Sequence, residues 1–196
     1  MKQEVRASHI LVLVDEGASP QDTLKAYNKV LEIKRRLDAG EDFIKVAQQF
    51  SEDPSVKENN GDLGYFSAFR MVYPFENAAY KTKSGQISKP FRTRFGYHII
   101  KVVDKRVNRG EVTVAHIMIL KQNDAAQNEK AKTTIDDIYK KIQQGESFES
   151  LAQQFSEDKS SSAKGGVLQR FGSGQLSSEE FENVAFSLQN KNDISK

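Results

Sequence analysis

Ala47-Gln48-Gln49-Phe50-Ser51-Glu52-Asp53 is repeated letter for letter at residues 152–158. Two further resemblances keep the same order along the chain: residues 5–13 resemble 112–120 before this repeat, and residues 75–77 match 181–183 after it. Matches that keep one order and nearly constant spacing indicate duplication of a structural unit. The sequence therefore predicts two tandem modules of about 100 residues each.

Each module begins with an apolar, β-branched run that contains a His-Ile pair and is typical of a central strand. Ser19 and Pro20 are typical of a helix start, and Gly40 of a helix stop. Helical spacing of apolar residues then predicts a second helix in module one and two helices in module two. The residues are Phe43, Val46, Ala47 and Phe50 in the first module, and Ile135, Ile138, Tyr139, Ile142, Phe148, Leu151, Ala152 and Phe155 in the second.

Two further strands of module one are predicted at residues 63–66 and 95–103, with a short helix at 74–80 between them. This order of elements predicts an α+β fold. We expect the modules to occupy residues 1–105 and 112–196. The polar residues 106–111 are predicted to link them.

Composition excludes several classes of protein. Hydrophobic residues make up 37% of the chain and charged residues 29%, which is ordinary for a globular protein and too apolar for disorder. The formal net charge of +2 with interspersed signs gives no basic stripe, so we expect no nucleic-acid partner. No run approaches the ~20 apolar residues of a membrane-spanning helix. Met1-Lys2-Gln3-Glu4 has no apolar signal-peptide core, so we expect that any signal peptide has been removed or never existed.

No cofactor or metal is expected. Cysteine is absent, and the three histidines, His9, His98 and His116, form no local ligand pair. The chain contains neither a phosphate-binding Gly-x-x-x-x-Gly-Lys loop nor a Gly-x-Ser-x-Gly nucleophile elbow.

His9 and His98 lie within apolar, strand-like runs at opposite ends of module one. A single histidine in a strand is usually structural, since a buried ring needs a hydrogen-bond partner. If the two strands are neighbours, however, the two rings can pair and orient one another, which builds a site.

Five segments of module one resemble the parvulin family of peptidyl-prolyl cis–trans isomerases in order and spacing. They are residues 9–12, 50–53, 61–66, 74–78 and 95–100. The resemblance covers residues 5–103 fully and 112–196 partly. It implies two parvulin-like modules, each a small, mostly antiparallel sheet packed with about three to four helices. Tandem modules of this kind are similar to the SurA- and PrsA-like folding factors of bacterial envelopes.

The resemblance also implies the site residues. The catalytic positions fall on His9, Asp53 and His98. The substrate-binding positions fall on Leu63, Met71, Phe75, Thr93 and Phe95, with Thr93 supporting the histidines. The matching but weaker set in module two is His116, Asp158, Leu176 and Phe181. Without the resemblance, Met71, Phe75 and Phe95 are equally consistent with core packing.

The implied function is non-covalent isomerisation of X–Pro bonds in unfolded or extended proline-containing polypeptides, assisting the folding of exported proteins. The alternatives are a peptide-binding chaperone module with little or no turnover, and a structural interaction domain in which the histidine pair is incidental. By resemblance, the location is the bacterial periplasm or cell envelope. Residues 14–22 carry three acids and no Lys or Arg, so no preference for phosphorylated substrates is expected.

Module two is expected to be catalytically silent. Residues 194–196 correspond to residues 87–89, so we expect the second module to be truncated, without the counterpart of the strand that carries His98. His116 therefore has no second histidine from its own module, while Asp158 and Phe181 remain available to bind peptide.

Overall fold

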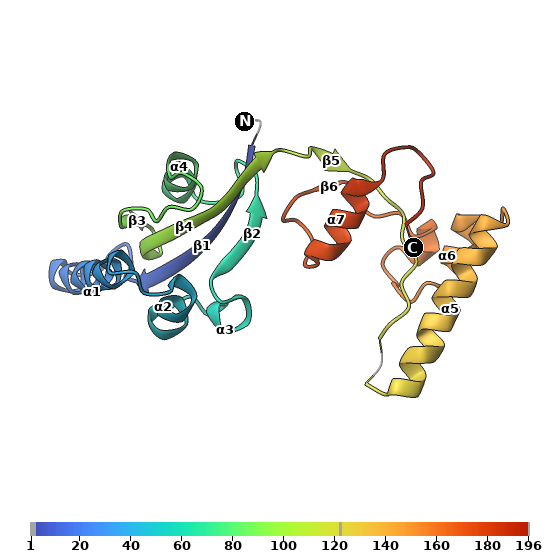
Figure 1. Ribbon diagram of the computed structural model, residues 1–196, viewed down its shortest axis with the longest axis horizontal. Helices are drawn as coiled ribbons and strands as arrows, with labels where there is room; N and C mark the ends of the chain where they lie inside the picture. Colours follow the sequence, from blue (N-terminus) through green and yellow to red (C-terminus); the bar gives the residue numbers. More distant parts are fainter. Residues whose placement is uncertain (1–2, 122, 196) are drawn as a thin grey trace. The chain divides into compact units, whose positions relative to one another are not determined.

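The computed structural model describes residues 3–121 and 123–195; residues 1, 2, 122 and 196 of the predicted modules lie outside the described residues. The chain divides after Arg109 into two compact units. We call the residues up to Arg109 unit 1 and those from Gly110 onwards unit 2 (Figure 1). No helix of the described residues is both long enough and apolar enough to cross a membrane.

Unit 1 is a four-stranded antiparallel sheet in the order β2-β1-β4-β3, covered by four helices. Its elements are β1 (Gln3–Leu13), α1 (Pro20–Asp38), α2 (Phe43–Phe50), α3 (Val56–Asn59), β2 (Asp62–Phe66), α4 (Tyr73–Lys81), β3 (Phe91–Thr93) and β4 (Gly96–Val107). The α+β class predicted from the sequence is confirmed.

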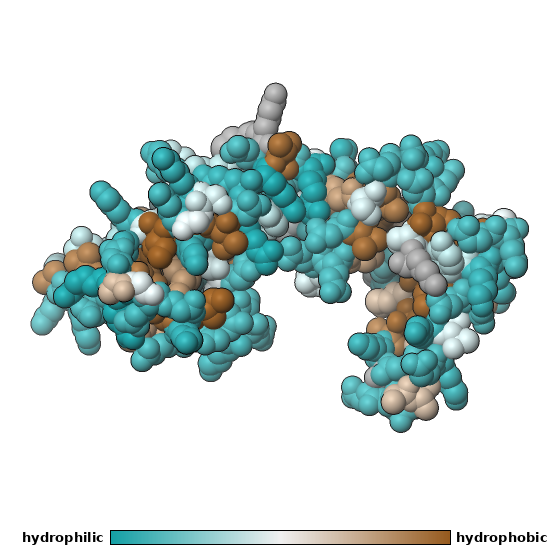
Figure 2. All heavy atoms as spheres, viewed as in Figure 1, coloured by the Kyte–Doolittle hydropathy of each residue, from teal (hydrophilic) through white to brown (hydrophobic). Residues whose placement is uncertain are grey.

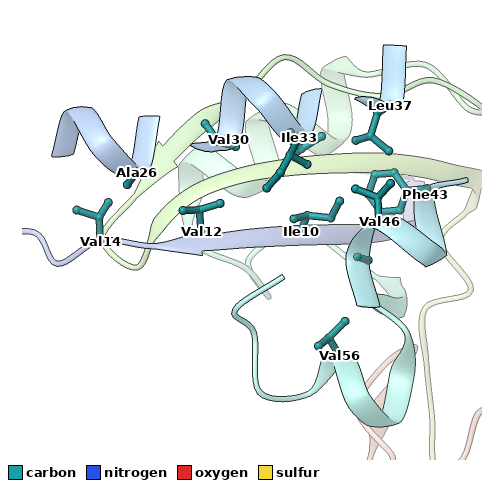
Figure 3. Close-up of a cluster of buried hydrophobic side chains, with 12 residues drawn as sticks. Ile10, Val12, Val14, Ala26, Val30, Ile33, Leu37, Phe43, Val46 and Val56 are labelled. Atoms are coloured by element: carbon teal, nitrogen blue, oxygen red, sulfur yellow. The ribbon is translucent and has the colours of Figure 1, made fainter. Parts of the chain in front are cut away.

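Two apolar clusters hold the helices of unit 1 to opposite faces of the sheet. On one face, Ile10, Val12 and Ile99 of the sheet pack against α1, α2 and α3 (Figure 3). On the other face, Val5, Ala7, Ile100 and Val102 pack against Phe75 and Ala79 of α4. Because side chains alternate along a strand, Ile10 and Ile99 lie on the first face, whereas His9 and His98, the residues just before them, lie on the second.

The start of α1 follows the predicted capping. Ser19 is the N-cap residue, its hydroxyl accepts a hydrogen bond from the Asp22 backbone N–H, and Pro20 begins the helix. The helix ends at Asp38, and Gly40 adopts a positive φ of 92° just beyond it. The prediction of a buried face on α2 is also confirmed, since Phe43, Val46 and Ala47 are buried.

The predicted linker is wrong at both ends. Strand β4 continues to Val107, where it pairs with Gln3, and residues 111–112 form a strand as well. The polar composition misled the prediction because the fully buried carboxylate of Glu4 binds Arg106, with 2.7 Å between Oε2 and Nε. The guanidinium of Arg106 also covers the ring of Tyr65. A charged residue at the end of a strand is thereby retained in the sheet.

Unit 2 repeats the helices but little of the sheet. Its elements are β5 (Glu111–Val112), α5 (Ala125–Gln143), α6 (Phe148–Phe155), the 3₁₀ helix η1 (Ser162–Lys164), β6 (Phe171–Gly172) and α7 (Glu179–Ser187). The two helices predicted from apolar spacing correspond to α5 and α6. The predicted strand at 112–120 is wrong, because only Glu111 and Val112 are in a strand, which pairs with β6, and Ala115 forms one isolated bridge.

The difference has a physical cause in strand pairing. In unit 1, β1 lies between β2 and β4, so both of its edges are hydrogen-bonded. In the described part of unit 2 no strand takes the place of β4 beside residues 113–120. A strand that is unpaired on one edge is less stable, and Ile117, Met118 and Ile119 are accordingly only partly buried.

Candidate functional site

His9 of β1 and His98 of β4 lie side by side on the sheet face that α4 covers. In the antiparallel register His9 is opposite Ile100 and Leu11 is opposite His98, so the two histidines are diagonal neighbours on one face. Their rings stack with centroids 5.8 Å apart and an angle of 21° between the planes. The two histidines therefore form a pair.

Two phenylalanine rings enclose this pair. Phe75 of α4 points edge-on at both histidines, with centroids 5.8 Å from His9 and 5.6 Å from His98. The ring of Phe91 in β3 stacks on the ring of His98, with centroids 5.4 Å apart and an interplanar angle of 14°. Phe75 is 4% exposed, so its ring belongs to the core and to the site at once.

Phe91 was missed by the sequence analysis. It pairs directly with His98 in the register of β3 and β4, whose turn consists of only Arg94 and Phe95. Recognising residues 91–93 as a strand that turns tightly into residue 96 would have placed Phe91 opposite His98.

Asp53 approaches His9 from the loop that follows α2. The backbone holds this loop to β1, because the Glu52 N–H donates to the Leu11 carbonyl at 2.8 Å. Oδ2 of Asp53 lies 2.6 Å from Nε2 of His9. The two atoms are close but not aligned as a hydrogen bond, so the contact is electrostatic. Oδ1 of Asp53 accepts hydrogen bonds from the backbone N–H and the hydroxyl of Ser55, both at 2.8 Å.

Thr93 positions His98 from the opposite side. Its Oγ1 lies 2.8 Å from Nε2 of His98 and also accepts a hydrogen bond from the Phe95 backbone N–H at 3.1 Å. Phe95 is thus linked to the histidines through Thr93, whereas its ring is 47% exposed beside the guanidinium of Arg94. Of the predicted substrate-binding residues, Phe95 has the most exposed side chain.

Burial sets the charge state of the pair. Burial lowers the pKa of His98 to about 4, and the neighbouring His9 adds to this effect while Asp53 opposes it. Burial also lowers the pKa of His9, although the carboxylate of Asp53 acts in the opposite direction. For Asp53, burial tends to raise the pKa, but hydrogen bonds from Ser55 and the contact with His9 outweigh burial and lower that pKa. At neutral pH the site therefore holds two neutral imidazoles beside one carboxylate.

Both imidazoles keep an unused polar atom. Nδ1 of His9 and Nδ1 of His98 are buried and have no hydrogen-bond partner among the described residues. Buried polar atoms are nearly always paired in folded proteins. Two such atoms on adjacent rings mark a place where a polar group of a ligand, such as a peptide carbonyl or amide, can be accommodated.

Leu63 and Met71 border the same cluster from β2 and the loop after it, where both are partly buried against the cluster that contains Phe75. The loop is fixed by the buried carboxylate of Glu76, whose Oε1 accepts from the backbone N–H groups of Arg70 and Met71 at 2.8 and 3.0 Å. The sequence analysis gave Glu76 no role, although its recurrence as Glu182 in the repeated Phe-Glu-Asn was a usable signal.

An open pocket of about 580 Å³ adjoins the histidines at Thr93. It is lined by Glu16, Ala18, Pro20, Thr23, Pro74, Arg92, Thr93 and Arg94. Leu63, Met71 and Phe75 do not line it, so this space is not the predicted proline pocket. Arg92 and Arg94 line this space together with Glu16 of the acidic loop 14–22, which the sequence analysis did not anticipate.

Unit 2 contains part of the same arrangement. Nε2 of His116 lies 2.8 Å from Oδ2 of Asp158, and its ring is edge-on to Phe181 with centroids 5.6 Å apart. Hydrogen bonds from the hydroxyl of Ser161, and then from His116 and Ser160, lower the pKa of Asp158. Leu176 is held by its backbone N–H, which donates to the buried Glu182. Since the chain has three histidines, unit 2 lacks the second ring of the pair.

No group of three or more metal-ligating side chains occurs within residues 3–121 and 123–195.

Comparison with known proteins gives a family match over most of the chain. The profile described as "Rotamase: PPIC-type PPIASE domain" matches residues 9–104 and again residues 116–196. The chain is 51% identical over 104 residues to the Foldase protein PrsA of Geobacillus sp. (strain WCH70), covering 53% of this chain and 33% of that protein. It is 34% identical over 178 residues to the Chaperone SurA of Hahella chejuensis, covering 89% of this chain and 41% of that protein.

A solved structure of the peptidylprolyl isomerase PrsA from Bacillus anthracis is also similar. It shares 39% identity, covers 69% of this chain and 52% of that chain, and superposes with a TM-score of 0.44. The chain spans about one third to two fifths of the length of the two curated relatives named above.

Proposed function

Because this chain belongs to the PPIC-type peptidyl-prolyl cis–trans isomerase family, we propose that unit 1 accelerates rotation about X–Pro bonds in extended polypeptides. The observation that carries the proposal is the stacked pair of buried histidines, His9 and His98, enclosed by Phe75 and Phe91 and flanked by Asp53. An apolar enclosure with a few convergent polar groups is the usual form of a binding site.

The reaction needs no covalent bond to be made or broken. Rotation about a peptide bond is opposed by a barrier of ~18–20 kcal/mol, because amide resonance is lost in the twisted state. The twisted amide is less dipolar than the planar one, so removing it from water favours the transition state over the ground state. Phe75 and Met71 supply apolar walls that hold a proline ring while the preceding carbonyl turns.

The histidines act on the amide as polar but uncharged groups. Burial keeps both rings neutral at neutral pH, as their lowered pKa values indicate. Their buried Nδ1 atoms are free to form a hydrogen bond with the turning peptide group. Asp53 acts electrostatically through His9. It is not assigned as a nucleophile, because covalent attack on the amide leaves no rapid route for its regeneration.

A role in the folding of exported proteins, in the bacterial periplasm or cell envelope, is part of the proposal. It is supported by the likeness to relatives named Foldase protein PrsA and Chaperone SurA.

For unit 2 we propose peptide binding with little or no turnover, as an independent module that follows the isomerase module. The observation that favours this second function is the retained contact between His116, Asp158 and Phe181 in a unit with a single histidine.

The proposed catalysis is tested by exchange spectroscopy of an unmodified X–Pro peptide mixed with the full chain. The wild-type protein is expected to accelerate cis–trans exchange, and Asp53→Asn to lower kcat/KM about tenfold, ~1.4 kcal/mol. Asp104→Asn is the matched control, because Asp104 accepts a hydrogen bond from Tyr65 and lies outside the histidine cluster. A folded wild-type chain that leaves the exchange rate unchanged would refute the isomerase proposal and favour the chaperone function.

A further inference from the structure

Phe69 has an unusual backbone conformation. Its φ is 67°, in the left-handed region that side chains with a Cβ atom rarely adopt. The other non-glycine residues with positive φ within the described ranges are Asn60 and Asn192, and asparagine tolerates this region well. A bulky residue that persists there indicates that something other than local stability keeps it.

Unit 2 contains the same turn with the residue that the backbone prefers. In unit 1, Glu76 holds the N–H groups of Arg70 and Met71. In unit 2, Glu182 accepts hydrogen bonds from the N–H groups of Gly174, Gln175 and Leu176, at 2.9, 2.9 and 2.8 Å. Phe69 lies two residues before Met71, and Gly174, with a φ of 75°, lies two residues before Leu176, the counterpart of Met71 in unit 2. The fold therefore accepts glycine at this position, and unit 1 carries phenylalanine instead.

The side chain of Phe69 contributes little to the core, since 89% of its surface is exposed. It is therefore not kept for packing. Tyr73, at the start of α4, is 78% exposed, so two exposed aromatic residues flank Met71 along the chain. Exposed aromatic residues are absent from the described part of unit 2, where the exposed large hydrophobic residues are aliphatic. The unit with the complete histidine pair is thus the one with exposed aromatic rings.

The position of Phe69 is set by the site. Two residues of extended chain span at most about 7 Å, and Met71 borders the cluster that contains Phe75. The anchoring of Met71 by Glu76 prevents this loop from drifting away from the site. Figure 2 shows hydrophobic residues gathered on unit 1 where Figure 1 places β3 and β4, the strands that carry Phe91 and His98.

We propose that Phe69 is a specificity-determining residue, which binds an aromatic or large apolar side chain of the polypeptide within two residues of the proline. The inference rests on the proposed function of the histidine site and names a feature of its substrates. An exposed ring held on a fixed turn loses little conformational freedom on binding, which suits it for contact with an apolar side chain of an unfolded chain.

The test compares peptides that differ only in one apolar side chain. One Phe is placed in turn at each of the two positions on either side of a single proline, in an otherwise all-Ala unmodified peptide. The dissociation constant for the full chain is measured by NMR titration, and kcat/KM by exchange spectroscopy. We expect at least one Phe peptide to bind wild-type protein about threefold to tenfold more tightly than the all-Ala peptide.

Phe69→Gly is expected to abolish that gain and to leave the affinity for the all-Ala peptide within about twofold, with the change in KM and not in kcat. Because Gly suits the backbone, this variant should have a urea midpoint at least as high as Phe69→Ala, which separates lost binding from lost folding. Ile44→Ala is the matched control. It also removes an exposed apolar side chain, but from α2 on the opposite face of the sheet.

The proposal is overturned if no Phe position improves wild-type binding, if Phe69→Gly keeps the gain, or if Ile44→Ala abolishes it equally. Failure of the proposed function has a different signature: wild-type protein binds the Phe peptide more tightly through Phe69 but accelerates the exchange of no peptide.

Discussion

Acid should destabilise unit 1 well before it protonates the carboxylates. His98 is 4% exposed, and burial lowers its pKa to about 4 from the 6.5 of an unfolded chain. Between these two pH values the unfolded chain binds a proton at this residue and the folded unit does not. The contribution of His98 to the unfolding free energy is therefore fully present above pH 6.5 and decreases as the pH falls toward 4. Below pH 4 this contribution does not change further.

The size of the effect follows from the shift. Each pKa unit corresponds to about 1.4 kcal/mol, so the change from 6.5 to about 4 corresponds to about 3 kcal/mol of lost unfolding free energy. The lowered pKa of His9 acts in the same direction. Asp53, whose pKa is also lowered, loses its contribution only below its unfolded pKa of 3.8, so its effect lies outside this window.

The measurement is urea unfolding of the full chain at pH 7.5, 6.5, 5.5 and 4.5, followed through the amide signals of Ile99 and Ile100 in β4. His98→Gln keeps a hydrogen-bonding partner for Thr93 and cannot be protonated, so it should remove most of the pH slope. His116→Gln, in unit 2, should leave the slope of unit 1 unchanged.

The reasoning fails if the ring signals of His98 titrate with a midpoint at or above 6.5. It also fails if His98→Gln loses as much stability as wild type between pH 7.5 and 4.5, since the buried imidazole is then not the group that couples folding to protons.

Three further outcomes are expected. Phe75→Ala should lower the unfolding free energy of unit 1 by about 3–5 kcal/mol in urea titrations, because the ring is both core and site, and a loss below ~1 kcal/mol would contradict its placement. A phosphoserine-proline peptide should be isomerised no faster than its glutamate-proline match. The guanidinium of Arg92 is already stacked on Tyr97, and the carboxylate of Glu16, which lines the same pocket as Arg92, repels a phosphate. A tenfold gain in exchange rate for the phosphopeptide would disprove the expectation. Hydrogen exchange should be faster in residues 112–120 than in residues 5–13, because β1 is paired along both edges; equal protection in a monomeric chain would argue against this.

Local signals were sufficient for the helices. The hydroxyl of Ser19 and the ring of Pro20 act within one turn, so α1 could be placed from a few letters. The extension of β4 to Val107 could not be placed this way, because it depends on Glu4, which lies at the other end of the unit in sequence. The same reason explains the failed strand at 112–120, which is apolar and β-branched but has no strand in the place of β4 within the described part of unit 2.

For the candidate site, the histidine pair followed from two strands that were expected to be neighbours, and their roles from the family resemblance. Phe91, Glu76 and Ser55 were missed because their contributions are made by stacking or by hydrogen bonds to a loop, neither of which leaves a periodic pattern. The role of Phe69 became visible only from its backbone angle and from the glycine at the matching turn of unit 2.

The pairing of the first and last strands of unit 1 has a consequence for its synthesis. His9 is in β1 and His98 is in β4, so nearly the whole unit must leave the ribosome before the two rings can meet. Such a long-range closure is slow compared with helix formation, and β1 is left without its main partner until it occurs. During synthesis the helices of unit 1 should therefore form early, and the histidine pair should form last. In a refolding experiment, X–Pro exchange activity should return together with protection of the β4 amides.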